Sequence, residues 1–173
     1  MELEAGKCLI SEAPGYVRRS LEDFYNFVKE RAARENASLG GDFPAACGGL
    51  WAEDILTILL NYPDRDYYYG RCEIALSFSG EEELIEIAVV SRPYHNEGRY
   101  EILRTIGALA MIFMDRDIGY EEARAFIGEL CGGDLRNDEN PVGWQSLGSL
   151  RAYIVAEDQD SDMVALEIHY GKR

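Results

Sequence analysis

A helical spacing of apolar residues marks several segments of the chain. From Ser20 to Asn36, apolar side chains recur every three or four positions and form one stripe, made of Leu21, Phe24, Tyr25, Phe27 and Val28. Ser20 and Asp23 have the spacing of a capping box, which predicts that this helix begins at Ser20. Similar stripes predict helices over 50–62, 98–114 and 120–131. The short connection between the last two predicts an antiparallel helix pair.

Strict alternation of apolar and polar residues marks the strands. Residues 71–79 place four apolar side chains on one face, namely Cys72, Ile74, Leu76 and Phe78. Residues 84–91 alternate in the same way after the turn at Gly80, so the two segments predict a β-hairpin. Residues 147–156 and 163–170 predict a second hairpin around the acidic turn at 157–162.

The element order α-α-β-β-α-α-β-β predicts an α+β fold. An antiparallel sheet built from the two hairpins, with about four helices packed mainly on one face, would bury all of these apolar stripes. The length of 173 residues is that of one domain, so residues 1–173 are predicted to form a single α+β domain. Weak periodicity over residues 1–19 predicts an irregular N-terminal segment.

The chain is strongly acidic, and this narrows the choice of partners. It has 32 Asp and Glu residues against 17 Lys and Arg, which gives a formal net charge of −15. The acidic residues are spread along the sequence, and a content of 47% hydrophobic residues is that of a globular protein. A negative field repels phosphate backbones and anionic lipids and attracts basic proteins, so neither direct nucleic-acid binding nor membrane binding is predicted. Solubility is the alternative role for the charge.

Localisation is predicted from the absence of export and membrane signals. The sequence shows no signal-peptide pattern and no apolar run of about 18 residues, the length needed to span a bilayer. The four cysteines, Cys8, Cys47, Cys72 and Cys131, form no C-x-x-C pair. A reduced, cytoplasmic protein is therefore expected.

No cofactor or metal ion is predicted from the spacing of possible ligands. The acidic turn places Asp158, Asp160 and Asp162 like the first ligands of an EF-hand loop, but Met163 stands where glycine is needed and His169 where glutamate is needed. A solvated turn is the better interpretation. With only two histidines and four scattered cysteines, a zinc site could arise only from positions far apart in the sequence.

Enzymatic chemistry has one weak candidate, the thiol of Cys47. Cys47 precedes the helix predicted over 50–62, and a helix N-terminus lowers the pKa of a thiol. His95 or His169 would supply the base. The negative charge of the chain would oppose a thiolate, so a thiol-dependent enzyme using Cys47 is an alternative hypothesis and a non-enzymatic protein is preferred.

An aromatic and acidic segment is the first candidate for partner binding. It contains Asp64, Asp66, Tyr67 and Tyr68, and tyrosine is enriched at binding hot spots. Two acidic turns would add steering charge, and they contain Glu81, Glu82, Glu83, Glu157, Asp158, Asp160 and Asp162.

The sequence favours a small acidic binding module whose partner is a basic protein. Such a module would inhibit, neutralise or escort its partner, in the manner of an immunity protein, an inhibitor or a chaperone. A structural subunit of a larger assembly is the remaining alternative, in which the charge only keeps the protein soluble. No known family is recognised in the sequence.

Overall fold

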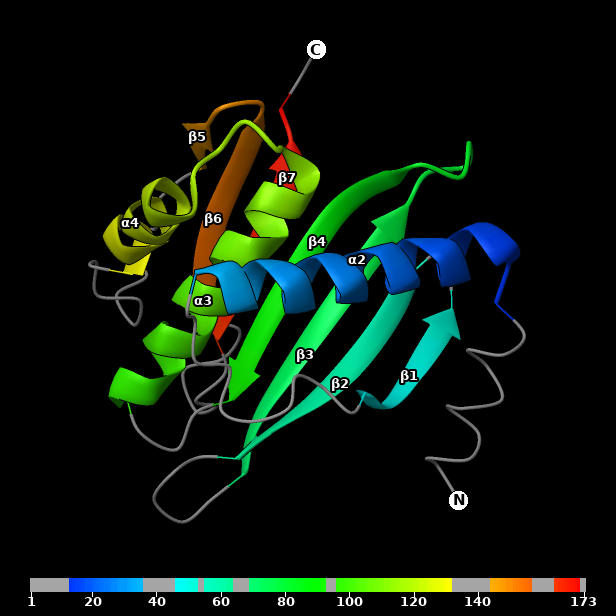
Figure 1. The fold of residues 1–173 in the computed structure, drawn as a ribbon, viewed down its shortest axis with the longest axis horizontal. Coiled ribbons are helices and arrows are strands. Elements are labelled where there is room, and N and C mark those ends of the chain that lie inside the picture. Colours follow the sequence, from blue (N-terminus) through cyan, green and yellow to red (C-terminus); the bar gives the residue numbers. More distant parts are fainter. Residues whose placement is uncertain are drawn as a thin grey trace.

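The described part of the chain forms one antiparallel sheet with helices on one side (Figure 1). This computed structural model describes residues 13–35, 46–52, 55–63, 69–92, 96–131, 144–156 and 164–171. They make up three helices and a seven-stranded sheet in the order β1-β2-β3-β4-β7-β6-β5. The fold class is therefore α+β, as the sequence predicts.

The strands run antiparallel to each of their neighbours. Their bounds are β1 Ala46–Ala52, β2 Ile55–Pro63, β3 Tyr69–Phe78, β4 Leu84–Arg92, β5 Gln145–Leu147, β6 Leu150–Ala156 and β7 Val164–Tyr170. The chain leaves the sheet after β4, forms two helices and returns, and β7 then pairs with β4. Residues more than seventy positions apart in the sequence thus become direct neighbours.

The helix predicted over 50–62 is wrong, because these residues lie in the strands β1 and β2. Ala52 lies opposite Ile55, and Ile58 pairs with Gly49 on one side and Ile74 on the other. The run from Ile55 to Leu60 is apolar at nearly every position, and a short run of this kind fits a strand between two neighbours as well as a helix. The described residues therefore hold three helices where about four were expected, and a third hairpin precedes the two predicted ones.

The first described helix, α2 (Gly15–Arg34), begins five residues before the predicted start at Ser20. Pro14 occupies the N-cap position, and its carbonyl accepts hydrogen bonds from the backbone N–H groups of Val17 and Arg18. Val17 is buried and lies one turn before Leu21, the first residue of the predicted apolar stripe. Burial of this extra turn explains the earlier start, whereas Ser20 lies inside the helix and caps nothing.

The other two helices agree closely with the sequence pattern. They are α3 (Asn96–Met114) and α4 (Tyr120–Cys131). Helix α3 packs on β4 and β7 and lies between α2 and α4. Its residues from Thr105 to Ile112 are all buried. At Gly107 an added Cβ would lie 2.5 Å from a methyl carbon of Leu166, so glycine permits the close approach of α3 to β7.

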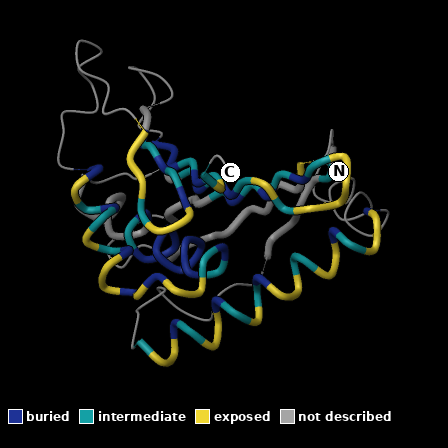
Figure 2. The backbone as a smooth tube through the Cα atoms, turned by 90° about the horizontal axis from the view of Figure 1, so that it is seen from above, coloured by how far each residue is buried: buried dark blue, intermediate teal, exposed yellow. Residues whose placement is uncertain are grey.

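The main core lies between the helices and one face of the sheet (Figure 2). In β3 the predicted inward residues Ile74, Leu76 and Phe78 are buried. The second predicted hairpin is also present, but its first strand is interrupted. Leu147 belongs to β5, and a two-residue turn at Gly148 separates it from Leu150 in β6. Gly148 has a φ of 56°, which explains a glycine at this turn.

Candidate functional site

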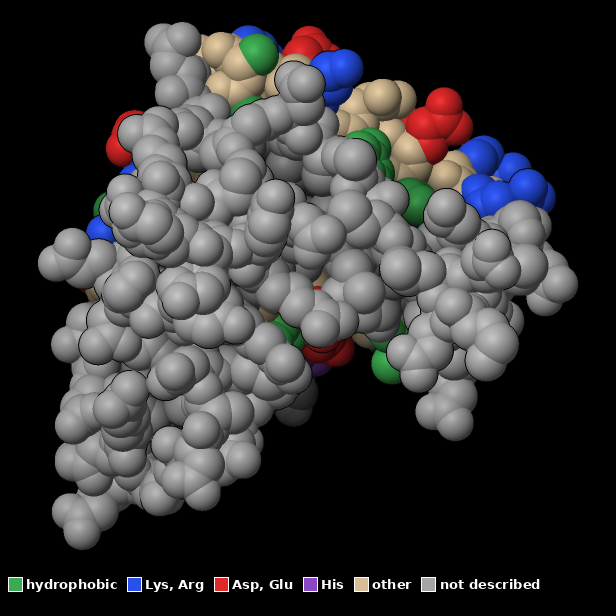
Figure 3. Space-filling view, turned by 90° about the horizontal axis from the view of Figure 1, so that it is seen from below, with side chains coloured by type: hydrophobic (Ala, Val, Ile, Leu, Met, Phe, Trp, Pro, Cys, Tyr) green, Lys and Arg blue, Asp and Glu red, His purple; other side chains and the backbone are tan. Residues whose placement is uncertain are grey.

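The face of the sheet turned away from the described helices carries a polar and aromatic cluster. Side chains alternate along a strand, so Glu86 in β4 and the pair Glu167 and His169 in β7 point opposite to the buried Ile87, Leu166 and Ile168. Figure 3 shows acidic side chains, a histidine and hydrophobic side chains together on the side of the molecule away from α2. We call this side of the sheet the open face.

Strand register brings the charged residues of the cluster together. Glu86 lies directly opposite His169, and Glu167 follows two positions away on the same face. Nε2 of His169 lies 3.3 Å from Oε2 of Glu86. Burial is the main reason that the pKa of the Glu86 carboxyl is raised, the nearby His169 opposes this shift, and the charge of Glu167 adds to it.

Strand β6 supplies a tyrosine and an arginine to the same face. Tyr153 lies opposite Glu167, and Arg151 lies opposite His169. The Tyr153 hydroxyl donates a hydrogen bond to the Glu167 carboxylate, and this bond is the largest cause that raises the pKa of Tyr153 to about 12. The uncharged Tyr153 hydroxyl therefore helps to fix the position of the Glu167 carboxylate.

Trp144 lies over this cluster, just before β5. Its ring centroid is 4.2 Å from that of Tyr153 and 4.8 Å from that of His169, which it meets at 90°. The Arg151 guanidinium carbon is 5.1 Å from the centre of the Trp144 ring, which is cation–π distance. Trp144 is nevertheless 40% exposed, so one side of a large aromatic ring remains available to a ligand or partner.

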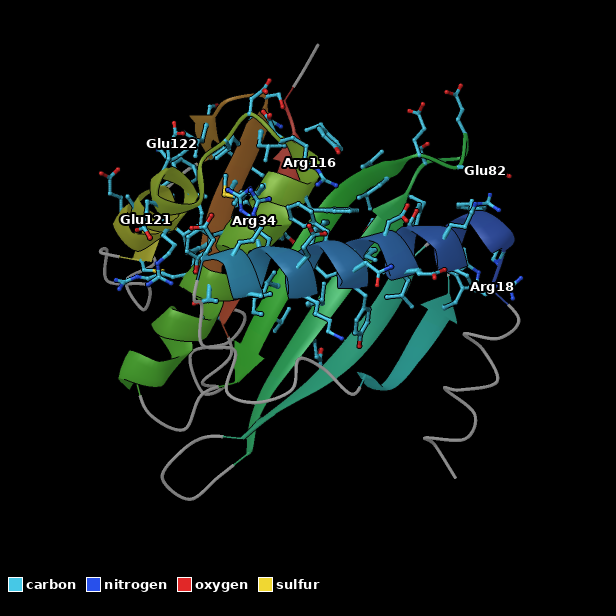
Figure 4. All side chains as sticks on the ribbon, viewed as in Figure 1. Arg18, Arg34, Glu82, Arg116, Glu121 and Glu122 are labelled. Atoms are coloured by element: carbon cyan, nitrogen blue, oxygen red, sulfur yellow. The ribbon has the colours of Figure 1, made fainter. Side chains whose placement is uncertain are left out.

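The acidic residues Glu81, Glu82 and Glu83 form the turn between β3 and β4, as the sequence predicts. All three are exposed, and Glu82 lies at the tip of the hairpin (Figure 4). The Ser79 hydroxyl accepts hydrogen bonds from the backbone N–H groups of Glu81 and Glu83. These bonds hold three negative charges in one compact turn at the end of the strand that also carries Glu86.

Most other sequence candidates lie outside the described residues. This applies to Asp64, Asp66, Tyr67 and Tyr68, and to the second acidic turn with Glu157, Asp158, Asp160 and Asp162. His95 also lies outside them. The roles assigned to these residues remain predictions.

The thiol of Cys47 lacks the helix N-terminus that was expected to make it reactive. Cys47 lies in strand β1 and not ahead of a helix, so no helix N-terminus is present there to lower its pKa. Cys131, at the end of α4, is buried in the hydrophobic core, where cysteine behaves as a small apolar residue.

The cluster on the open face was missed from the sequence, although part of its signal was visible. Glu167 and His169 are two residues apart in a predicted strand, which places them on one face. Their meeting with Glu86 and Tyr153 depends on which strands pair and in which register, and no local pattern reveals this.

Comparisons of the chain with protein-family models, with curated proteins and with solved structures find no significant match. Among the described residues, no helix is long and apolar enough to cross a membrane.

Proposed function

We propose that this protein is a non-enzymatic binding module that holds a basic macromolecular partner and thereby inhibits, neutralises or escorts it. The observation that supports this most is the exposed Trp144 ring, which lies on Tyr153 and His169 in a chain of net charge −15. Trp, Tyr and Arg are the residues that most often dominate binding energy at protein interfaces. An exposed aromatic anchor on a chain of strongly negative net charge suits a partner with basic side chains.

The acidic turn beside the open face also supports a basic partner there. The open face holds Glu73, Glu86 and Glu167 together with Arg151, and Arg71 and Arg92 occupy strand positions of the same parity. Helix α2, in contrast, carries five basic residues, namely Arg18, Arg19, Lys29, Arg31 and Arg34, among three acidic ones. The turn at Glu81–Glu83 places three exposed negative charges at one end of the sheet.

The experiment is capture of a partner from source lysate by the tagged full chain, washed first at low and then at high salt. The proposal expects one stoichiometric basic protein that is released at high salt, because screening weakens the attraction between exposed charges. Trp144→Ala should abolish capture, whereas Ile85→Ala should not, since Ile85 is similarly exposed at 44% but lies outside the contacts of Trp144.

A charge-matched pair of variants tests the acidic turn. The triple variant E81Q/E82Q/E83Q should weaken capture, while E22Q/E121Q/E129Q removes the same charge from exposed positions on α2 and α4 and should not. Figure 4 shows Glu121 on α4, on the other side of the molecule from Glu82. Equal capture by all variants, or no captured partner, would contradict the proposal.

The aromatic segment predicted from the sequence is tested separately. Changing Tyr67 and Tyr68 to Ser should weaken capture without changing the melting temperature if both contribute to the partner surface. A fall in melting temperature would instead assign these rings to the core.

A further inference from the structure

Two carboxylates and one imidazole on the open face have the composition of a metal site. Glu86, Glu167 and His169 each offer one ligand atom, and these three atoms all lie within 4.8 Å of one another. The residues come from two paired strands near the middle of the sheet, where the backbone is held by hydrogen bonds on both sides. The site is therefore built on regular structure and not on a flexible surface loop.

One of the three ligand separations matches that of two ligands on a metal ion. Zinc binds imidazole nitrogen and carboxylate oxygen at about 2.0–2.2 Å, which places two ligands of a tetrahedral ion roughly 3.3–3.5 Å apart. The separation of Nε2 of His169 and Oε2 of Glu86 is 3.3 Å. A direct charged hydrogen bond between these groups would favour a shorter separation, about 2.7–2.9 Å.

The surroundings of the three residues add an independent observation. Tyr153 donates a hydrogen bond to Glu167, and the edge-on Trp144 ring restricts the orientation of the His169 imidazole. Groups that orient the ligands in this way are a regular part of metal sites. A simple cross-strand ion pair between Glu86 and His169 would need neither the second carboxylate nor its tyrosine.

We propose that Glu86, Glu167 and His169 bind a divalent transition-metal ion of the zinc type on the open face of the sheet. The ion would offset the repulsion between the two neighbouring carboxylates. Three protein ligands leave the fourth position to water or to a donor atom of a bound molecule. This inference is independent of the binding function proposed above.

The first test is a titration of the full chain with Co²⁺, which takes the same ligands as Zn²⁺ and absorbs visible light. One equivalent should bind and give visible bands without the near-ultraviolet band of a cysteine–cobalt bond. His169→Ala and Glu167→Gln should each weaken binding at least about tenfold, because loss of a group that only orients a ligand already weakens metal binding by that much. His95→Ala should leave it unchanged, and far-ultraviolet circular dichroism should show that every variant is folded.

The position of the bound Co²⁺ ion is tested by nuclear magnetic resonance in the same titration. Paramagnetic Co²⁺ should broaden the indole signals of Trp144, whereas those of Trp51 should remain sharp, because Trp51 packs against Tyr16 and Phe78 on the helix side. Tyr153→Phe should lower the affinity roughly tenfold while the visible spectrum keeps its shape, since it removes a positioning residue and no ligand.

Two results would overturn the proposal. One is the failure of the wild-type chain to bind a stoichiometric amount of Co²⁺ or Zn²⁺. The other is equal affinity in the wild-type protein and the folded His169→Ala variant, which would assign the bound metal to other residues.

Discussion

Asp115 and Ser149 join the helical layer to the edge of the sheet. Oδ2 of Asp115, just after α3, accepts hydrogen bonds from the Ser149 hydroxyl at 2.7 Å and from its backbone N–H at 3.0 Å. Ser149 lies in the turn between β5 and β6. The other carboxylate oxygen accepts a hydrogen bond from the backbone N–H of Asp117 and shapes the turn before α4. The Asp115 carboxylate thus stabilises both the turn before α4 and the turn between β5 and β6.

Ser149→Ala should lower the free energy of unfolding by about 1 kcal/mol at neutral pH, because it removes one hydrogen bond to a charged acceptor at an exposed site. The backbone N–H and hydroxyl of Ser149 lower the pKa of the Asp115 carboxyl. A lowered pKa contributes stability above the unfolded value of about 3.9, and this contribution is lost as the pH falls through the folded value. Urea unfolding should therefore show a difference between variant and wild type that shrinks below about pH 4. A constant difference down to pH 2 would contradict the assignment.

Gly148→Ala should destabilise the protein by about 1–3 kcal/mol. Gly148 has a φ of 56°, and an added Cβ would lie 2.8 Å from Oδ2 of Asp115. The methyl group would therefore disturb the hydrogen bonds of Asp115 as well as strain the turn. Gly80→Ala is the control, because no atom lies within 4 Å of its added Cβ. Thermal unfolding of both variants checks the expectation, and equal melting temperatures would contradict it.

Gly107→Ala should also be destabilising, by about 1–3 kcal/mol, although alanine favours helices. Its Cβ would lie 2.5 Å from Cδ2 of Leu166 and 2.9 Å from Cδ1 of Ile127, so these two side chains or α3 itself would have to shift inside a fully buried part of the core. Gly128→Ala in α4 is the matched control, since its nearest neighbour would be the Arg104 side chain at 3.5 Å. Chemical denaturation should show a loss for Gly107→Ala and a neutral or small stabilising effect for Gly128→Ala. A stabilised Gly107→Ala would mean that the helix and sheet are less tightly packed.

Glu82→Gly should stabilise the protein by roughly 0.5 kcal/mol. Glu82 has a φ of 65°, a conformation that costs other residues more than glycine. The gain is partly offset by the greater freedom of glycine in the unfolded chain. Glu81→Gly removes an equal charge from the same turn without this relief, so it should be the less stable of the two in a urea titration. The reverse order would contradict the role assigned to the backbone at Glu82.

The local sequence pattern correctly predicted the helices and strands that bury only one face in the core. Helix α4 has the predicted bounds, and the alternation in β3 placed Ile74, Leu76 and Phe78 correctly. The pattern failed over 50–62, because apolar residues there occupy positions on both faces of β1 and β2 and follow no single period. It also placed the first helix start at Ser20, because a capping pattern inside a helix looks the same as one at its end.

The candidate site depends on long-range pairing that local pattern does not contain. Glu86 meets His169 only because β7 pairs with β4, and a shift of one residue in that register would turn His169 toward the core. Trp144 lies outside every helix and strand predicted from the sequence, yet it contacts Tyr153 in β6 and His169 in β7, two strands that follow it in the sequence. Charge and aromatic content predicted a binding protein, but not the face that would bind.

The association rate of the captured partner, measured at increasing ionic strength, tests the central claim most directly. If acidic charge steers a basic partner to this protein, the rate should fall at least about tenfold between low and high salt, and E81Q/E82Q/E83Q should bind more slowly at low salt. The control E22Q/E121Q/E129Q should keep the wild-type rate at low salt. An association rate that does not change with ionic strength would contradict the account.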